Sequence, residues 1–126
     1  KKGYSETLTG RRRPIPDIHS KNVPIRLFAE RVAVNTPLQG TAADLIKAAM
    51  LEIFHRILPK YPRSKLVLQV HDELLFESDA DEVELLKGDV KSVMESPDLL
   101  AHFGVKGFEV IMKAEASIGK NWGALK

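Results

Sequence analysis

A histidine and two carboxylates stand together between two short apolar runs near the middle of the chain. His71, Asp72 and Glu73 lie between residues 66–70 and residues 74–76. Runs of this length that are rich in branched and aromatic residues predict two short buried strands. Carboxylates at such a junction are costly to bury unless a cation, a hydrogen-bond network or open solvent offsets their desolvation. The pattern therefore predicts either a divalent-metal site or a hairpin with its polar tip in water, since Asp is also a common turn residue.

A second set of polar side chains recurs every four residues along a stretch with helical periodicity. Arg31, Asn35 and Gln39 share one face of a helix if the helix axis continues through Pro37. All three side chains can donate hydrogen bonds, and the minor groove of every correct base pair offers acceptors at nearly fixed positions. Such a row can sense the shape of a duplex without reading its sequence. The alternative is the solvated face of an ordinary amphipathic helix.

Composition limits the kinds of site that the chain can build. It has 126 residues, 44% of them hydrophobic, which suits one compact domain, and it has no cysteine. Disulfides, thiolate metal sites and a thiol nucleophile are therefore excluded. The apolar runs are short and no signal-peptide core follows the N-terminus, so we expect an intracellular chain with no membrane span. Because no initiator Met is present, we also expect a fragment of a longer protein.

The net charge of +2 conceals an unequal division between the two halves of the chain. Residues 1–65 carry 13 Lys and Arg against 5 Asp and Glu, which gives +8, and residues 66–126 carry 6 against 12, which gives −6. A basic first half suits a polyanion such as nucleic acid, because each neutralised phosphate releases condensed counterions. The alternative is a basic half that docks on the acidic half or on another domain.

The first half of the chain predicts a hairpin followed by a long helix. Residues 4–15 alternate in a strand-like pattern around Gly10, with three arginines at 11–13 that indicate either a solvated edge or phosphate contacts. Helical periodicity runs from Pro24 to Leu58, with a broad apolar face in its second half. Pro37 predicts a kink, or else two helices that meet at Asn35 and Thr36 with Thr36 as the cap of the second.

The second half predicts a helix and a strand after the central pair of strands. Ser78 or Asp79 can cap a helix that runs to Met94. Residues 109–118 alternate apolar and polar side chains, as in a half-exposed strand.

Four blocks of the sequence, in order and at matching distances, resemble the C-terminal end of a family A DNA polymerase of the bacterial DNA polymerase I type. They are GYSETLTGRRRPIPDI (3–18), ERVAVNTPLQGTAADLIKAAM (30–50), LQVHDELLFE (68–77) and GKNW (119–122). The resemblance implies an α+β fold with an antiparallel palm-type sheet and a central catalytic hairpin on long helices, preceded by a small β-hairpin. It assigns residues 1–22 to the end of the fingers subdomain and residues 23–126 to a palm fragment.

The resemblance also assigns roles to single residues. It implies that Asp72 is a catalytic carboxylate that binds metal, that Glu73 is its catalytic neighbour, and that His71 lies close to the primer terminus. The donor row of Arg31, Asn35 and Gln39 matches the family's helix that touches DNA through the minor groove. The implied reaction is two-metal nucleotidyl transfer to a primer 3′ hydroxyl, with two Mg²⁺ ions, primer-template DNA and deoxynucleoside triphosphates as cofactors and partners.

The family's other metal-binding aspartate and its triphosphate-binding helix do not occur in this sequence. We therefore expect the chain to be inactive alone, to need the missing N-terminal part of the same polymerase, and to work in the cytoplasm on the nucleoid. Two rival functions are a non-catalytic nucleic-acid-binding module and a metal-dependent hydrolase that uses residues 71–73. The hydrolase lacks further ligands, because His19, His55 and His102 show no metal-site spacing.

Overall fold

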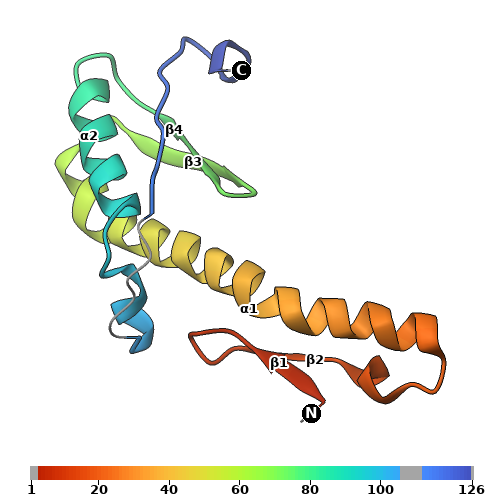
Figure 1. Cartoon of the computed structure of the whole chain (residues 1–126). Coiled ribbons are helices and arrows are strands. Elements are labelled where there is room, and N and C mark those ends of the chain that lie inside the picture. The colour runs from red at the N-terminus through yellow and green to blue at the C-terminus, as the bar shows by residue number, and fades with distance from the viewer. Residues whose placement is uncertain (1–2, 106–111, 126) are drawn as a thin grey trace.

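A computed structural model describes residues 3–105 and 112–125 and shows one long helix with a β-hairpin on either side (Figure 1). The elements are β1 (Tyr4–Glu6), β2 (Arg12–Pro14), α1 (Val23–Glu52), β3 (Lys65–Val70), β4 (Glu73–Glu77) and α2 (Val83–Met94). β1 and β2 form a first antiparallel hairpin, and β3 and β4 form a second. The predicted mixture of helices and small antiparallel sheets is confirmed. No wider sheet joins the two hairpins within the described residues.

The long helix α1 begins at a side-chain cap and continues across its internal proline. Asn22 Oδ1 accepts a hydrogen bond of 3.4 Å from the backbone N–H of Ile25, and Pro24 occupies the first turn. Thr36 does not cap a second helix: it is buried within α1, and its hydroxyl donates to the carbonyl of Val32 at 2.7 Å. The prediction of two helices is therefore wrong, whereas the alternative of a bend is confirmed by the shallow change of direction in the middle of α1 (Figure 1).

The first hairpin supplies the hydrogen bond that Pro37 removes. Proline has no N–H, so the carbonyl of Ala33, four residues earlier, loses its partner in the helix. The hydroxyl of Ser5 in β1 donates to that carbonyl at 2.8 Å, and Ser5 is buried. The partly buried carbonyl is therefore satisfied by a group from outside the helix.

The turn of the first hairpin docks on α1 around a buried carboxylate. Asp44 is 2% exposed and accepts hydrogen bonds from Arg11 Nε at 2.7 Å, from the Thr7 hydroxyl at 3.3 Å and from the Thr9 hydroxyl. Arg11 also donates from Nη2 to the carbonyl of Gly40 at 3.2 Å. We call this set of contacts the Asp44 clamp. It fixes the hairpin to α1 at a point where an unpartnered carboxylate would be costly.

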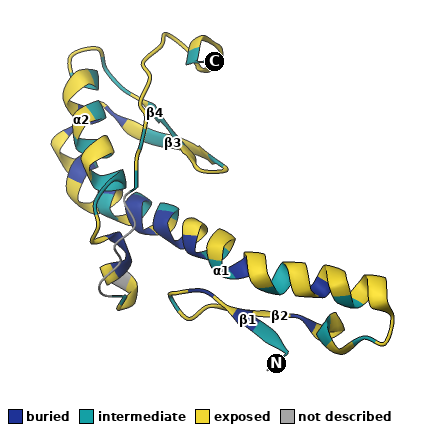
Figure 2. Ribbon diagram, in the orientation of Figure 1, coloured by how far each residue is buried: buried dark blue, intermediate teal, exposed yellow. Residues whose placement is uncertain are grey.

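The apolar core lies at the C-terminal half of α1. Figure 2 shows that buried residues gather there, while the N-terminal half of the helix is mostly exposed. One cluster joins α1 to the segment after α2, through Leu45, Ala48, Ala49, Leu99 and Leu100. A second cluster joins the end of the helical segment to α2, through Ile53, Ile57, Tyr61 and Leu86. The Tyr61 hydroxyl donates to Asp89 at the edge of this cluster, and the bond raises the pKa of Tyr61 to about 12.

Several apolar residues predicted to lie in the core are instead at the surface. Leu38 is 73% exposed and Phe54 is 62% exposed, although both belong to the predicted apolar face of the helix. Phe28, in the first turns of α1, is 61% exposed. The two core clusters lie at the C-terminal end of the helical segment, away from Phe28 and Leu38, and Phe54 is in neither cluster although its neighbours Ile53 and Ile57 are.

Two predicted elements of the second half differ from the structure. α2 begins at Val83 without a side-chain cap: Asp79 Oδ1 accepts from the backbone N–H of Asp81 at 3.0 Å, in the turn before the helix, and Ser78 bonds to Ser64. The predicted strand at 109–118 lies partly outside the described residues, and its described part, 112–118, is not a strand. Residues 113–118 line a groove together with β4 and α2 but pair with neither hairpin strand.

We predict that Gly40→Ala lowers the free energy of unfolding by about 1 to 3 kcal/mol. A Cβ at Gly40 would lie 2.3 Å from Thr7 Cγ2, and moving Thr7 would disturb its bond to Asp44. Urea unfolding measures the change. Gly88→Ala in α2 is the matched control: its Cβ meets nothing within 4 Å, so helix propensity should stabilise it by about 0.5 to 1 kcal/mol. Equal stabilisation by both changes would contradict the close approach at Gly40.

Candidate functional site

The tip of the second hairpin consists of His71 and Asp72. Val70 at the end of β3 pairs with Glu73 at the start of β4, so only these two residues form the turn. His71 has a φ of 51°, an uncommon conformation for a residue other than glycine but one that histidine tolerates comparatively often. The side-chain amide of Gln69 donates to the carbonyl of His71 and supports the turn. The turn therefore holds Asp72 at a defined place at the end of two paired strands.

The side chains at this tip lie in solvent. His71, Asp72 and Glu73 are all exposed, and the flanking strands are only partly buried, which corrects the prediction of two buried strands. No side-chain hydrogen bond or ion pair of these three residues occurs within residues 3–105 and 112–125. Because these carboxylates are exposed, they have no desolvation cost that a cation would have to offset. The prediction of a metal site therefore needs other evidence.

The donor set at the tip can contribute only part of a metal site. Among the residues that the structure describes, no group of three or more histidines, cysteines and carboxylates is placed to hold an ion. Asp72 and Glu73 are nevertheless suitable oxygen donors, because magnesium in phosphoryl-transfer sites takes one or two carboxylates and fills its other positions with water and substrate phosphates. The tip can therefore supply some of the ligands of such a magnesium site, and the remaining ligands must come from elsewhere.

The donor row is exposed along α1. Arg31, Asn35 and Gln39 are all exposed, and each step of four residues turns the side chain by about 40° around the helix. The Arg31 guanidinium lies 5.9 Å from the centroid of the Phe28 ring. The amides of Asn35 and Gln39 make no hydrogen bond within the described parts of the chain. The row thus presents a guanidinium and two amides to an outside acceptor.

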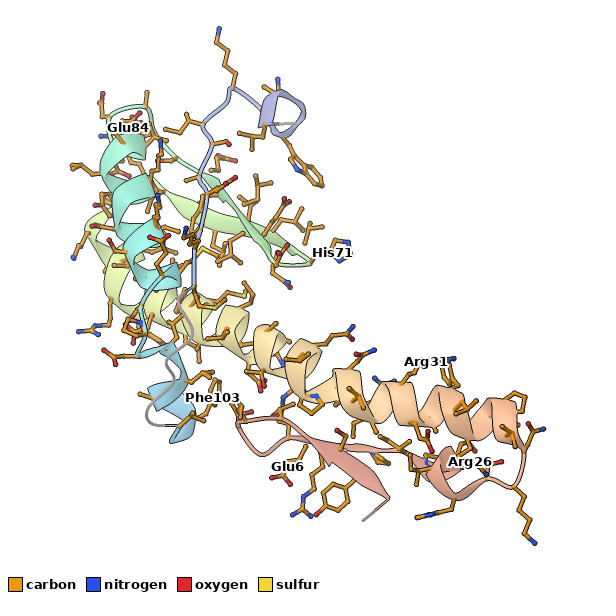
Figure 3. All side chains as sticks on the ribbon, in the orientation of Figure 1. Glu6, Arg26, Arg31, His71, Glu84 and Phe103 are labelled. Carbon is orange, nitrogen blue, oxygen red and sulfur yellow. The ribbon has the colours of Figure 1, made fainter. Side chains whose placement is uncertain are left out.

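Arg31, the first residue of the donor row, points toward the side of the molecule that carries the hairpin tip. Figure 3 shows Arg31 leaving α1 on the side toward the tip that carries His71, while the first hairpin lies on the other side of the helix. The structure therefore brings Arg31 and the tip to one side, whereas Gln39 lines a groove together with the first hairpin. Their proposed roles in catalysis and DNA binding stay predictions.

Sequence reasoning missed the Asp44 clamp, which holds the first hairpin against the donor-row helix. The sequence contained a sign of it, because Asp44 is a carboxylate directly before Leu45, a residue of the predicted apolar face. A buried Asp requires partners, and three arginines with two threonines were the available donors in the first hairpin. Because these donors lie more than 30 residues before Asp44 in the sequence, local patterns do not reveal the pairing.

The chain belongs to DNA polymerase family A. The model of that family, described as "DNA polymerase family A", matches residues 1–124, which confirms the resemblance. The DNA polymerase I of Bacillus subtilis (strain 168) is 45% identical over 121 residues, covering 96% of this chain and 13% of the relative. The thermostable DNA polymerase I of Thermus filiformis is also 45% identical over 121 residues, with the same two shares. The chain thus spans about 13% of the length of these relatives.

A solved structure supports the same family. The chain is similar to the POL domain of Pol1 from M. smegmatis in complex with DNA primer-template and dNTP, with a TM-score of 0.68 and 46% sequence identity. The match covers 74% of this chain and 16% of that one. In the described residues, no helix is long and apolar enough to cross a membrane.

Proposed function

We propose that the chain is the C-terminal palm portion of a DNA-directed DNA polymerase, with the end of the fingers at residues 1–22 and the palm fragment at 23–126. In the complete enzyme it takes part in template-directed nucleotidyl transfer to a primer 3′ hydroxyl on chromosomal DNA. One observation carries this proposal: the model of a polymerase family matches residues 1–124, and the matched segment presents an exposed carboxylate tip and an exposed donor row. The Pol1 domain in complex with primer-template and dNTP supports the choice of substrates.

In this proposal the hairpin tip provides one share of the catalytic centre. Asp72 holds a magnesium ion through its carboxylate, and Glu73 orients a water or the primer hydroxyl. Magnesium, when two ions are bound, supplies positive charge that stabilises the in-line transition state of phosphoryl transfer. The exposed tip leaves room for substrate phosphates and waters, and the paired strands keep Asp72 from shifting. His71 lies beside the primer terminus.

In this proposal the donor row binds the DNA. Arg31, Asn35 and Gln39 donate to the N3 and O2 acceptors in the minor groove near the primer end. Because these acceptors occupy similar positions in all correct base pairs, the row senses shape rather than sequence. The basic first half of the chain, with a charge of +8 over residues 1–65, favours the approach of DNA.

One observation favours a second candidate, a non-catalytic nucleic-acid-binding module. Within the described residues, Asp72 and Glu73 have no third metal-binding side chain beside them. The module would keep the donor row but would not need Asp72. A test of Asp72 therefore separates the two functions.

We predict that Asp72→Ala lowers the rate of primer extension by at least about a thousandfold while primer-template affinity changes little, because the carboxylate acts in the transition state. The measurement uses a chimaera in which this chain replaces the matching 121 residues of the Bacillus subtilis relative. Asp98→Ala is the control, since Asp98 is an exposed carboxylate outside the site. Undiminished extension by the Asp72 variant would favour the binding module. Extension by the isolated chain would refute the expectation that it holds only part of the catalytic centre.

We predict that Gln39→Ala in the same chimaera slows extension of matched primers about tenfold or more, because it removes a hydrogen bond worth about 1 to 3 kcal/mol. The same substitution should slow the extension of a mismatched primer less, since the mismatch has already displaced the minor-groove acceptor. Single-turnover extension rates for both termini measure the difference. Equal losses on matched and mismatched primers would mean that Gln39 only supports the fold.

A further inference from the structure

The first hairpin bonds to α1 on both sides of Pro37. Before the proline, the hydroxyl of buried Ser5 donates to the carbonyl of Ala33 at 2.8 Å. After the proline, Arg11 from the turn of the hairpin pairs with buried Asp44 at 2.7 Å. The hairpin therefore bridges the two parts of α1 that meet at the bend (Figure 1).

Pro37 weakens α1 at the bend. Its ring removes one backbone hydrogen bond and crowds the carbonyl of Ala33, so the bonds of the helix itself do not fix the angle there. Ser5 donates to the carbonyl that the proline leaves unpaired, and the Asp44 clamp anchors the same hairpin beyond the proline. The Ser5 bond thus ties the part of α1 before the bend to a hairpin that is fixed after it.

The donor row extends across this bend. Arg31 and Asn35 precede Pro37, and Gln39 follows it. A change of angle at the proline therefore moves Gln39 relative to the other two donors. Because the minor-groove acceptors of correct base pairs occupy nearly fixed positions, the three donors can meet them together only over a narrow range of angles.

We propose that Ser5 is a positioning residue for the donor row: its hydroxyl fixes the bend of α1 and thereby the direction of Gln39 relative to Arg31 and Asn35. Ser5 is buried and bonded to Ala33, so it acts through the helix and needs no contact with DNA. The inference rests on the proposed function, because it assumes that the donor row binds the minor groove. The bend itself can be measured without DNA.

The first measurement determines the bend, from residual dipolar couplings of the backbone N–H groups of α1 in the 126-residue chain. Ser5→Val should change the angle between the parts before and after Pro37 by about 10° or more, because the Ala33 carbonyl loses its donor. Ser5→Thr, which differs from Ser5→Val by a hydroxyl in place of a methyl group, should keep the angle. In the Pro37→Ala background, the restored N–H at position 37 can bond to Ala33, so Ser5→Val should leave the angle unchanged there.

The second measurement determines the consequence for DNA, by single-turnover extension in the chimaera. Ser5→Val should slow the extension of matched primers about fivefold and of mismatched primers less, as expected for Gln39→Ala, because both changes act on the same contact. Added to Gln39→Ala, Ser5→Val should cause no further loss. Ser5→Thr should stay within about twofold of the unsubstituted chimaera, because it keeps the hydroxyl. Ser92→Ala, which removes an exposed hydroxyl from α2, is the control and should change neither rate.

An unchanged angle in the Ser5→Val chain would overturn the inference and leave the proposed function intact. A changed angle with equal losses on matched and mismatched primers would also overturn it, because a purely structural defect lowers the fraction of active enzyme and slows both termini alike. The proposed function fails by a different result, undiminished extension by the Asp72→Ala chimaera.

Discussion

The buried carboxylate of Asp44 is the constraint on which the arrangement of the first half depends. At 2% exposure it cannot rely on water, and removing one partner of such a charge typically costs several kcal/mol. Its partners come from the turn of the first hairpin, where Arg11 and two threonines converge on it. Only a glycine at position 40 lets Thr7 come close enough. The hairpin therefore has one place to dock.

The docked hairpin in turn makes the long helix possible. Pro37 would leave the carbonyl of Ala33 without a partner, and Ser5 provides one only when β1 lies against α1. Because α1 is continuous, Arg31, Asn35 and Gln39 lie on one helix at regular four-residue spacing. The positions of the proposed DNA contacts thus follow from polar contacts between the first hairpin and α1, rather than from the apolar core at the C-terminal end of the helix.

Local patterns predicted the elements whose partners are close in sequence. Both hairpins followed from alternation and turn residues, because each strand pairs with the next one along the chain. The strand at 109–118 was not formed over 112–118, since alternation shows which residues can pair but not whether a neighbouring strand is available. Leu38 and Phe54 were predicted to lie in the core but are exposed for a similar reason: the type of an apolar side chain does not show which part of the protein covers it.

The site was predicted to very different extents. The spacing of the donor row was readable, because four-residue steps share a helix face, and all three side chains are exposed as that interpretation requires. The role of Asp72 was not readable from chemistry, since two exposed carboxylates at a turn are also ordinary surface; only family membership supports it. The Asp44 clamp was missed because its donors lie 33 to 37 residues away.

The most direct test of the Asp44 constraint is a double-mutant cycle of Arg11→Ala and Asp44→Ala, measured by urea unfolding of the isolated chain. The Arg12 and Glu6 pair, whose side chains are 63% and 45% exposed, provides a matched cycle at the surface of the same hairpin. If the buried carboxylate fixes the hairpin on α1, Arg11 and Asp44 should couple by about 1 to 3 kcal/mol, against less than about 1 kcal/mol for the surface pair. Equal, small coupling in both cycles would contradict the constraint.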